Sequence, residues 1–217
     1  PMLRALAFKY IMENKKLTVL PGELIVGERG SQPKATPTYP EVCVHSIQDL
    51  DILDSREKVS YSVDDETREL YKNDIIPFWQ GQSIRERVFR ELPQEWKDAY
   101  EAGVYTEFLE QRAPGHTVLG NKIYNKGMLD LKAEIQARIA QLDFFKDPEA
   151  LDRKEQLEAM AVAADALIAY ARRYSGKLRE MAKGETDETR KKELETMADV
   201  CHHVPAHAPR NFHEALQ

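Results

Sequence analysis

The sequence predicts a mainly α-helical chain, and three observations support this fold class. Apolar residues recur with helical spacing over most of the second half of the chain. Residues that cap helices precede several of these segments. Charged residues make up 31% of the 217 residues, a proportion typical of helical soluble proteins, and 42% apolar residues are enough for a packed core.

The clearest element is a long helix that begins near Asp147-Pro148-Glu149, which has the order of an N-cap, a first-turn proline and a first-turn acid. Apolar residues then alternate spacings of three and four until Gly184, as in a heptad seam. A final helix stops at Pro205, and the short charged turn between the two predicts an antiparallel hairpin. The seams consist of Leu157, Met160, Ala164, Leu167, Ala171, Tyr174, Leu178 and Met181, and of Leu194, Met197, Cys201 and Val204.

Shorter elements are expected in the first half. An N-terminal helix closes at Asn14 and carries an apolar stripe of Leu3, Leu6, Tyr10 and Ile11. The apolar run 24–26 lies between glycines and predicts a brief strand.

Capping patterns predict the helices that follow. Ser62 is expected to cap a helix that reaches about Lys72, and Pro77 to interrupt the next one. Ser83-Ile-Arg-Glu86 matches a capping box, and Pro93 and Gly103 suit the start and stop of another helix. One more stripe consists of Leu131, Ile135, Ile139 and Leu142.

The last residues also predict a helix start. Asn211 with Glu214 resembles a capping box, but the sequence stops about two turns later. Because so short a helix has not covered its nucleation cost, we expect the sequence to be a piece of a longer protein.

Composition excludes several functional classes. The formal charge of 31 − 37 = −6 argues against a nucleic-acid surface. No apolar run approaches the roughly 20 residues that span a bilayer, and no signal-peptide pattern is present. Cys43 and Cys201 lie far apart and fit no CxxC spacing, which favours a reducing, cytoplasmic location.

One histidine stands out as a candidate catalytic residue. His116 lies in the turn EQRAPGHTVLG, where Pro114 stiffens the chain and Gly115 permits an unusual backbone conformation. A rigid turn of this kind would aim one imidazole as a proton or hydrogen-bond donor, and Phe108 would supply an apolar wall. The alternative is that His116 packs in a loop and bonds a carbonyl.

Two further groups favour structural roles. Four of the six histidines (His202, His203, His207 and His213) fall within twelve residues, which raises a zinc site. Pro205 breaks the helical spacing that such a site would need, and no cysteine or carboxylate completes a pattern, so we predict no metal site. Cys43 beside His45 lacks a third orienting group and is expected to be a buried thiol.

Several stretches, in order along the chain, carry a resemblance to a known family: LRALAFKYIMEN, GELIVGERG, PTYPE, IIPFW, EWKDAYEAGVYTEFLEQRAPGHTV, KGMLDLKAEI and VPAHAPRNFHEALQ. The sequence resembles the N-terminal part of the pyruvate formate-lyase-like domain of the glycyl radical enzymes. The phrase TEFLEQRAPGHT is most similar to members that dehydrate trans-4-hydroxy-L-proline. The resemblance implies that residues 1–217 are an incomplete N-terminal part of that domain: a helical portion, with few short strands, of a ten-stranded α/β barrel.

The resemblance also implies a mechanism. In this family a partner enzyme that uses S-adenosylmethionine and an iron–sulfur cluster creates a protein-based glycyl radical, which oxidises an active-site cysteine. The thiyl radical removes hydrogen from C5 of hydroxyproline, water leaves, and pyrroline-5-carboxylate forms. His116 matches the histidine that contacts the leaving hydroxyl, and Phe108 matches a pocket-lining aromatic residue. The family also implies a homodimer.

The sequence departs from the family in one respect. Neither cysteine matches the thiyl motif and no radical glycine is present, so both residues are expected outside this chain, which should be inactive alone. Alternatives are a diol dehydratase, a carbon–sulfur lyase or a carbon–carbon lyase of the same family, or a non-catalytic helical scaffold that binds a partner through the heptad seam.

Overall fold

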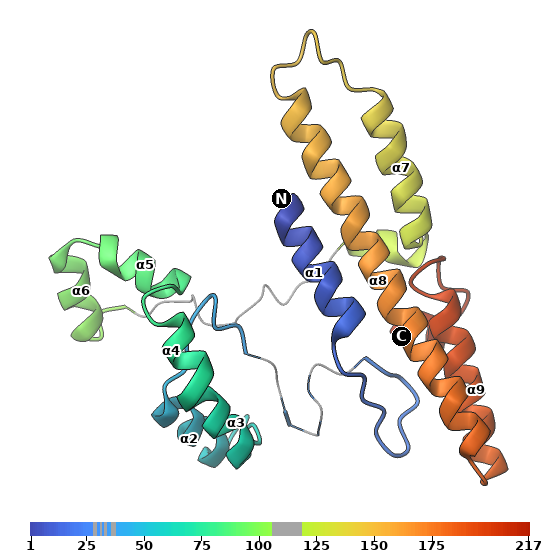
Figure 1. Cartoon of the computed structure of the whole chain (residues 1–217), viewed down its shortest axis with the longest axis horizontal. Helices are drawn as coiled ribbons and strands as arrows, with labels where there is room; N and C mark the ends of the chain where they lie inside the picture. Colours follow the sequence, from blue (N-terminus) through green and yellow to red (C-terminus); the bar gives the residue numbers. More distant parts are fainter. Residues whose placement is uncertain (28–29, 31, 33, 36–37, 106–118) are drawn as a thin grey trace. The chain divides into compact units, whose positions relative to one another are not determined.

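The structure is a computed structural model that describes residues 1–217 except 28–29, 31, 33, 36–37 and 106–118 (Figure 1). The chain forms two compact units. The first unit combines the chain before about residue 28 with the chain after about residue 117, and the second contains the residues between. The first unit is therefore built from two stretches that lie far apart in the sequence.

Helix α8 (Ala150–Gly184) is the central element of the first unit, and three helices pack along it (Figure 1). These are α1 (Met2–Asn14), α7 (Met128–Ala140) and α9 (Glu188–His203). The shorter elements are the 3₁₀ helix η2 (Gly120–Tyr124) and α10 (Phe212–Leu216). The mainly helical prediction is confirmed, and so is the hairpin of α8 and α9.

The α8–α9 hairpin contains the core of the first unit. Tyr174 and Leu178 of the predicted α8 seam are buried there, together with Leu194, Met197 and Cys201 of α9. Each large aliphatic side chain removed from water contributes about 1.5–3 kcal/mol. Met160, in the first half of the seam, is by contrast 47% exposed. The buried cluster consists of Val26, Tyr174, Leu178, Ala182, Leu194, Met197, Ala198 and Cys201.

Polar side chains of α8 form hydrogen bonds to its neighbours α9 and α1. The Ser175 hydroxyl donates to the Ala198 carbonyl of α9 at 2.7 Å. The Arg173 guanidinium donates to the Lys15 carbonyl at 2.6 Å and also to the Met12 carbonyl. Because the last carbonyls of a helix have no partner within the helix, Arg173 satisfies the end of α1 and fixes it on α8.

The apolar stripe of α1 does not face the core. Leu3 is 85% exposed and Tyr10 is 68% exposed, whereas Ala5 is buried and Phe8 and Met12 are half-buried. The helix is apolar on nearly all sides, so its periodicity does not say which face packs on α8.

The strand predicted at residues 24–26 is also wrong, because those residues form no strand in the structure. Val26 is nevertheless paired on both backbone groups. Its N–H donates to the Gln217 side-chain oxygen at 3.0 Å, and the Gln217 amide nitrogen donates to the Val26 carbonyl at 2.9 Å. The side-chain amide of Gln217 thus makes the two backbone hydrogen bonds that a neighbouring strand would have made.

Helix α7 begins against the turn that follows α9. The Met128 N–H donates to the Pro205 carbonyl at 2.8 Å, and the Leu129 N–H donates to the Ala206 carbonyl at 3.1 Å. A Cβ atom at Gly127 would lie 2.2 Å from that Ala206 oxygen. Glycine is therefore required at 127 because the two backbones approach too closely for any side chain.

The second unit consists of short helices. The elements in order are α2 (Ile47–Ser55), α3 (Asp65–Leu70), the π-helical turn η1 (Tyr71–Ile75), α4 (Ile76–Trp79), α5 (Ile84–Glu91) and α6 (Gln94–Glu101). The capping box at the start of α5 is confirmed: the Ser83 hydroxyl accepts from the Glu86 N–H, and the Glu86 carboxylate accepts from the Ser83 N–H at 3.2 Å.

Three predicted helix boundaries need correction. Asp64, rather than Ser62, caps α3, because its carboxylate accepts from the Thr67 N–H at 2.8 Å. Pro77 does not interrupt its helix, because it lies in the first turn of α4, directly after η1. A first-turn position needs no backbone N–H donor, so proline is tolerated there. Helix α8 begins at Ala150 rather than at Pro148, and the Asp147 side chain accepts a hydrogen bond from the Glu149 N–H just before the helix.

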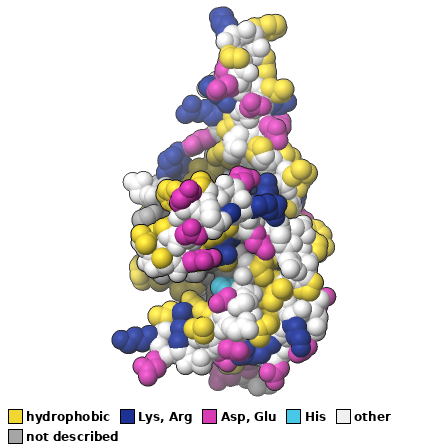
Figure 2. All heavy atoms as spheres, turned by 90° about the vertical axis from the view of Figure 1, so that its left-hand side faces the viewer, with side chains coloured by type: hydrophobic (Ala, Val, Ile, Leu, Met, Phe, Trp, Pro, Cys, Tyr) yellow, Lys and Arg dark blue, Asp and Glu magenta, His cyan; other side chains and the backbone are white. Residues whose placement is uncertain are grey.

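The surface mixes charges of both signs. On the face shown in Figure 2, Lys and Arg side chains are interspersed with Asp and Glu, with hydrophobic side chains between them. In the described part of the chain, no helix combines the length and apolar character needed to cross a membrane.

Candidate functional site

His116 and Phe108, the residues predicted to act on substrate, both lie in 106–118, outside the described residues. The structure does describe the chain on either side. The preceding residues belong to α6 and its C-terminal turn, and the following residues lead through η2 into α7. The site is therefore characterised by what holds its two flanks.

The flank before the segment ends in a cluster of aromatic rings. The Tyr105 ring centroid lies 5.5 Å from that of Trp96 and 5.8 Å from that of Tyr100, and its hydroxyl donates to the Trp96 carbonyl at 2.8 Å. Tyr100 in turn meets Phe89 of α5 edge-to-face at 5.0 Å. Such pairs contribute about 0.5–1.5 kcal/mol each beyond burial.

Arg85 links the two helices that carry this cluster. Its guanidinium carbon lies 4.4 Å from the centroid of Phe89 and 5.7 Å from that of Tyr100. Its Nη2 also donates to the Tyr100 hydroxyl at 3.2 Å. One cation thus contacts two rings and one phenol, which holds α5 and α6 together.

The flank after the segment turns sharply. Leu119 and Gly120 both adopt left-handed conformations, with φ of 70° and 57°. The left-handed conformation is costly for a leucine and free for a glycine, so this turn is imposed by its surroundings. Lys126 then forms an ion pair with Glu134 of α7.

Three of the C-terminal histidines stack on one another or lie within hydrogen-bonding distance of backbone carbonyls. The His203 and His207 rings stack with centroids 5.1 Å apart. His203 Nε2 lies 3.0 Å from the Ala208 carbonyl, and His213 Nε2 lies 3.1 Å from the Leu24 carbonyl. Among the described residues, no three His, Cys, Asp or Glu side chains gather as metal ligands.

Both cysteines are buried, as predicted for Cys43. Burial raises the pKa of the Cys201 thiol to about 12, because an apolar environment disfavours the thiolate. Since the thiolate is the reactive form of cysteine, Cys201 is unreactive at neutral pH.

Two buried phenols were not singled out from the sequence. Burial raises the pKa of Tyr71, whose hydroxyl donates to Thr38, and also that of Tyr174, whose hydroxyl donates to the Thr18 carbonyl at 3.3 Å. Both therefore remain neutral hydrogen-bond donors. Tyr71 begins the π-helical turn, which no sequence pattern had indicated.

Glu214 was predicted as part of a capping box, but not as a buried charge. Its side chain is only 2% exposed. The carboxylate accepts from the Arg210 N–H at 2.6 Å and from Arg210 Nε at 2.9 Å, and these hydrogen bonds lower the pKa of Glu214. The capping prediction at Asn211 is confirmed, since its side-chain oxygen accepts from the Glu214 N–H at 3.0 Å.

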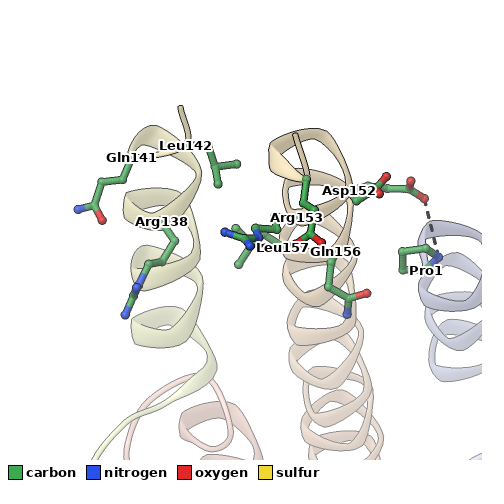
Figure 3. A pocket seen from close by; sticks show the side chains of 10 residues that line it. Pro1, Arg138, Gln141, Leu142, Asp152, Arg153, Gln156 and Leu157 are labelled. Atoms are coloured by element: carbon green, nitrogen blue, oxygen red, sulfur yellow. Dashed lines mark hydrogen bonds and ion pairs between the residues drawn. The ribbon is translucent and has the colours of Figure 1, made fainter. Parts of the chain in front are cut away.

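Two hollows of the first unit are candidate binding sites. One, of about 340 Å³, lies among Tyr170, Cys201, His207 and Gln217 and is mostly apolar. The other is an open groove between the adjoining ends of α7 and α8, where the Leu142 side chain points toward α8 (Figure 3). Arg153 in that groove is paired with Asp147 and Glu149 of its own chain segment.

Comparison with known proteins identifies the family. The model for pyruvate formate lyase-like proteins matches residues 1–217. The chain belongs to the pyruvate formate lyase-like family. It is 50% identical over its whole length to trans-4-hydroxy-L-proline dehydratase from Clostridioides difficile, and it spans 28% of that protein.

Solved structures of this family match the same region. The crystal structure of hydroxyproline dehydratase from Clostridioides difficile, with trans-4-hydroxy-L-proline bound, superposes with a TM-score of 0.90 at 50% identity and covers 100% of this chain and 27% of that one. A glycyl radical enzyme from Archaeoglobus fulgidus gives 0.80 at 30% identity, covering 100% and 28%. The resemblance to glycyl radical enzymes is confirmed, and the chain spans little more than a quarter of these relatives.

Proposed function

We propose that this chain is an incomplete part of the pyruvate formate lyase-like domain of a glycyl radical dehydratase, which converts trans-4-hydroxy-L-proline to pyrroline-5-carboxylate and water. The observation that carries the proposal is the 50% identity over all 217 residues to a dehydratase of that specificity. A TM-score of 0.90 to the substrate-bound enzyme supports it.

The radical chemistry is assigned to residues outside this chain. A protein-based glycyl radical, installed by an activating enzyme that uses S-adenosylmethionine, would generate a thiyl radical on a cysteine, and that thiyl radical would remove the hydrogen at C5. Neither Cys43 nor Cys201 matches the family's thiyl motif, so the thiyl role is assigned to neither of them. We place the protein in the cytoplasm, as a homodimer.

His116 and Phe108 are the residues of this chain that we assign to the substrate. Hydroxide is a poor leaving group, so His116 donates a proton or a hydrogen bond to the oxygen as its bond to carbon breaks. Phe108 forms an apolar wall beside the ring. The departing hydroxyl oxygen takes up one proton and leaves as water, and the imidazole is the group that delivers that proton.

The proposal is tested in the full-length protein after activation. His116→Gln should retain the glycyl radical, measured by electron paramagnetic resonance, but should lose about 10²- to 10⁴-fold in hydroxyproline turnover, the usual worth of general acid catalysis. His202→Gln, which alters an exposed histidine on α9, is the control and should leave both readouts unchanged. Near-normal turnover by His116→Gln would remove His116 from the mechanism.

Substrate specificity is decided by a panel. Activated wild-type protein should form pyrroline-5-carboxylate from hydroxyproline and should leave propane-1,2-diol, glycerol and isethionate unreacted. Efficient turnover of one of the other substrates would assign the protein to another branch of the family.

A further inference from the structure

A short segment of the first unit, residues 23–26, is attached to its surroundings almost entirely by side chains. These residues, which we call the lid, form no helix and no strand. Among the described residues, the lid has one backbone-to-backbone hydrogen bond, a local one from the Glu23 N–H to the Leu20 carbonyl at 3.2 Å. The lid can therefore move away without breaking a helix or a sheet, and such segments open at low cost in free energy.

Three side chains from α9 and the C-terminal residues hold the lid in place. Arg190 donates to the carbonyl of the first lid residue at 2.8 Å, and His213 Nε2 lies 3.1 Å from the carbonyl of the second. Gln217 makes two hydrogen bonds, with the Val26 N–H at 3.0 Å and with the Val26 carbonyl at 2.9 Å. Gln217 is therefore the attachment of the inner end of the lid.

A glycine with a left-handed backbone lies at each end of the lid. Gly22 has a φ of 75° and Gly27 has a φ of 104°. A Cβ atom at either position would meet no other atom within 4 Å, so the space around both residues is open. Hinges are a few positions that absorb large changes of φ and ψ, and glycine does so with the least strain. The two glycines are suited to be the hinges of the lid.

The inner end of the lid lies over a buried thiol and beside a hollow. Val26 is 6% exposed and belongs to the same buried cluster as Tyr174 and Cys201. The hollow of about 340 Å³ is lined by Val26, Tyr174, Cys201 and Gln217 together. The two partners of the double hydrogen bond are therefore also part of the wall of the hollow.

We propose that Gln217 is the latch of a lid that controls access to this hollow. While both hydrogen bonds to Val26 are made, the lid covers the Cys201 thiol and closes this side of the hollow. When they break, the lid turns about its two flanking glycines, and a small molecule reaches the thiol. The proposal does not depend on the substrate assigned above.

The rate at which Cys201 is labelled measures the opening of the lid. Full-length protein that has not been activated is treated with methyl methanethiosulfonate, and the label on each cysteine is followed by peptide mass spectrometry. The thiolate sulfur attacks the methylthio sulfur of the reagent, a mixed disulfide forms, and methanesulfinate leaves. Because burial raises the pKa of the Cys201 thiol to about 12, the closed form reacts slowly and labelling reports the open form.

Removal of the latch should make the thiol accessible. Gln217→Ala abolishes both hydrogen bonds to the lid and should accelerate labelling of Cys201 roughly tenfold, as expected for the loss of a hydrogen-bonded pair. Gly27→Ala should also accelerate it, since a side chain disfavours the left-handed backbone of the closed lid. An unchanged rate in Gln217→Ala would overturn the proposal.

Two controls separate the latch from general damage. Gln156→Ala makes the same substitution at an exposed position of α8 and should be labelled as wild type is. Cys43, which is buried in the second unit, should be labelled at the same rate in every variant. Equal acceleration at Cys43 and Cys201 in Gln217→Ala would show general unfolding and would overturn the latch.

Urea distinguishes a lid from unfolding in the wild-type protein. The effect of urea on an opening reaction scales with the surface that the opening exposes, and a lid of four residues exposes little. The rate of Cys201 labelling should therefore rise only weakly with urea below the unfolding transition. A rise as steep as that of global unfolding would mean that the thiol is reached by unfolding alone, and the lid would be rejected.

Discussion

Single residues bear roles that the sequence pattern only partly conveys. Asn211 and Glu214 matched a capping box, and the cap is present, but the pattern did not reveal that the Glu214 carboxylate would be 2% exposed and bound by Arg210. A buried charge depends on its partners, because removing one of them leaves an uncompensated charge. That dependence is a tertiary property which residue spacing does not encode.

The Glu214 network predicts a pH-dependent contribution to stability. Hydrogen bonds from Arg210 lower the pKa of Glu214 in the folded protein below its ordinary value of 4.5. The contribution is therefore complete above about pH 4.5 and is lost as the pH falls through the lower folded value. Glu214→Gln should lower the unfolding midpoint of the full-length protein at pH 7, by the equivalent of about 1–3 kcal/mol.

The loss of stability caused by Glu214→Gln should be smaller at acidic pH. Unfolding midpoints measured from pH 7 to pH 3 should converge for wild type and Glu214→Gln at the acidic end. Glu158→Gln, which alters a 44% exposed member of a surface ion pair, is the control and should follow wild type throughout. Parallel curves for Glu214→Gln and wild type would contradict this assignment.

At the scale of elements, local sequence signals predicted where helices form, but not which face of a helix packs on the core or which partner a segment pairs with. The α8–α9 hairpin follows from heptad spacing, and α5 follows from its capping box. The inward face of α1 did not follow, because that helix is apolar on nearly all sides. The apolar pattern at residues 24–26 could not distinguish backbone pairing with a neighbouring strand from pairing with the side chain of Gln217. In both cases the missing information is the partner.

The start of α7 predicts opposite outcomes for two glycines. Gly127→Ala places a Cβ atom 2.2 Å from the Ala206 oxygen, a backbone atom that cannot move aside, and should destabilise the protein by about 1–3 kcal/mol. Gly176→Ala, inside α8 with no atom within 4 Å of the new carbon, should stabilise it by about 0.5–1 kcal/mol.

Denaturant midpoints of the two full-length variants test this pair. Both substitutions add the same methyl group, so their difference isolates the close approach at α7. Equal shifts of the same sign would show that the α7 start is looser than its hydrogen bonds to Pro205 and Ala206 indicate.

At the scale of the whole molecule, the 217 residues form two units whose surfaces retain many apolar side chains. Leu3, Tyr10, Phe145 and Phe212 are each at least 68% exposed. Composition alone indicated enough apolar residues for a core, but it could not say how many lie outside one. The sequence also indicated His116, in the turn 110–120, and Phe108 as site residues; both lie outside the described residues, so their geometry stays a prediction.

Produced alone, the 217-residue chain should therefore self-associate. Contiguous apolar surface promotes association, so light scattering after size exclusion should report masses above the 25.0 kDa of one chain. A double substitution of Leu3→Gln with Tyr10→Gln should reduce the association, since it makes the outer face of α1 polar. A monodisperse chain that melts cooperatively would contradict this prediction.

The pairing of Val26 with Gln217 joins residues that are 191 positions apart. During synthesis at about 5–20 residues per second, the ribosome needs roughly 10–40 s to add those residues. The second unit, which is continuous in sequence, is complete long before that. The nascent α1 therefore emerges long before α8, the helix on which it packs, and the whole second unit is synthesised between them.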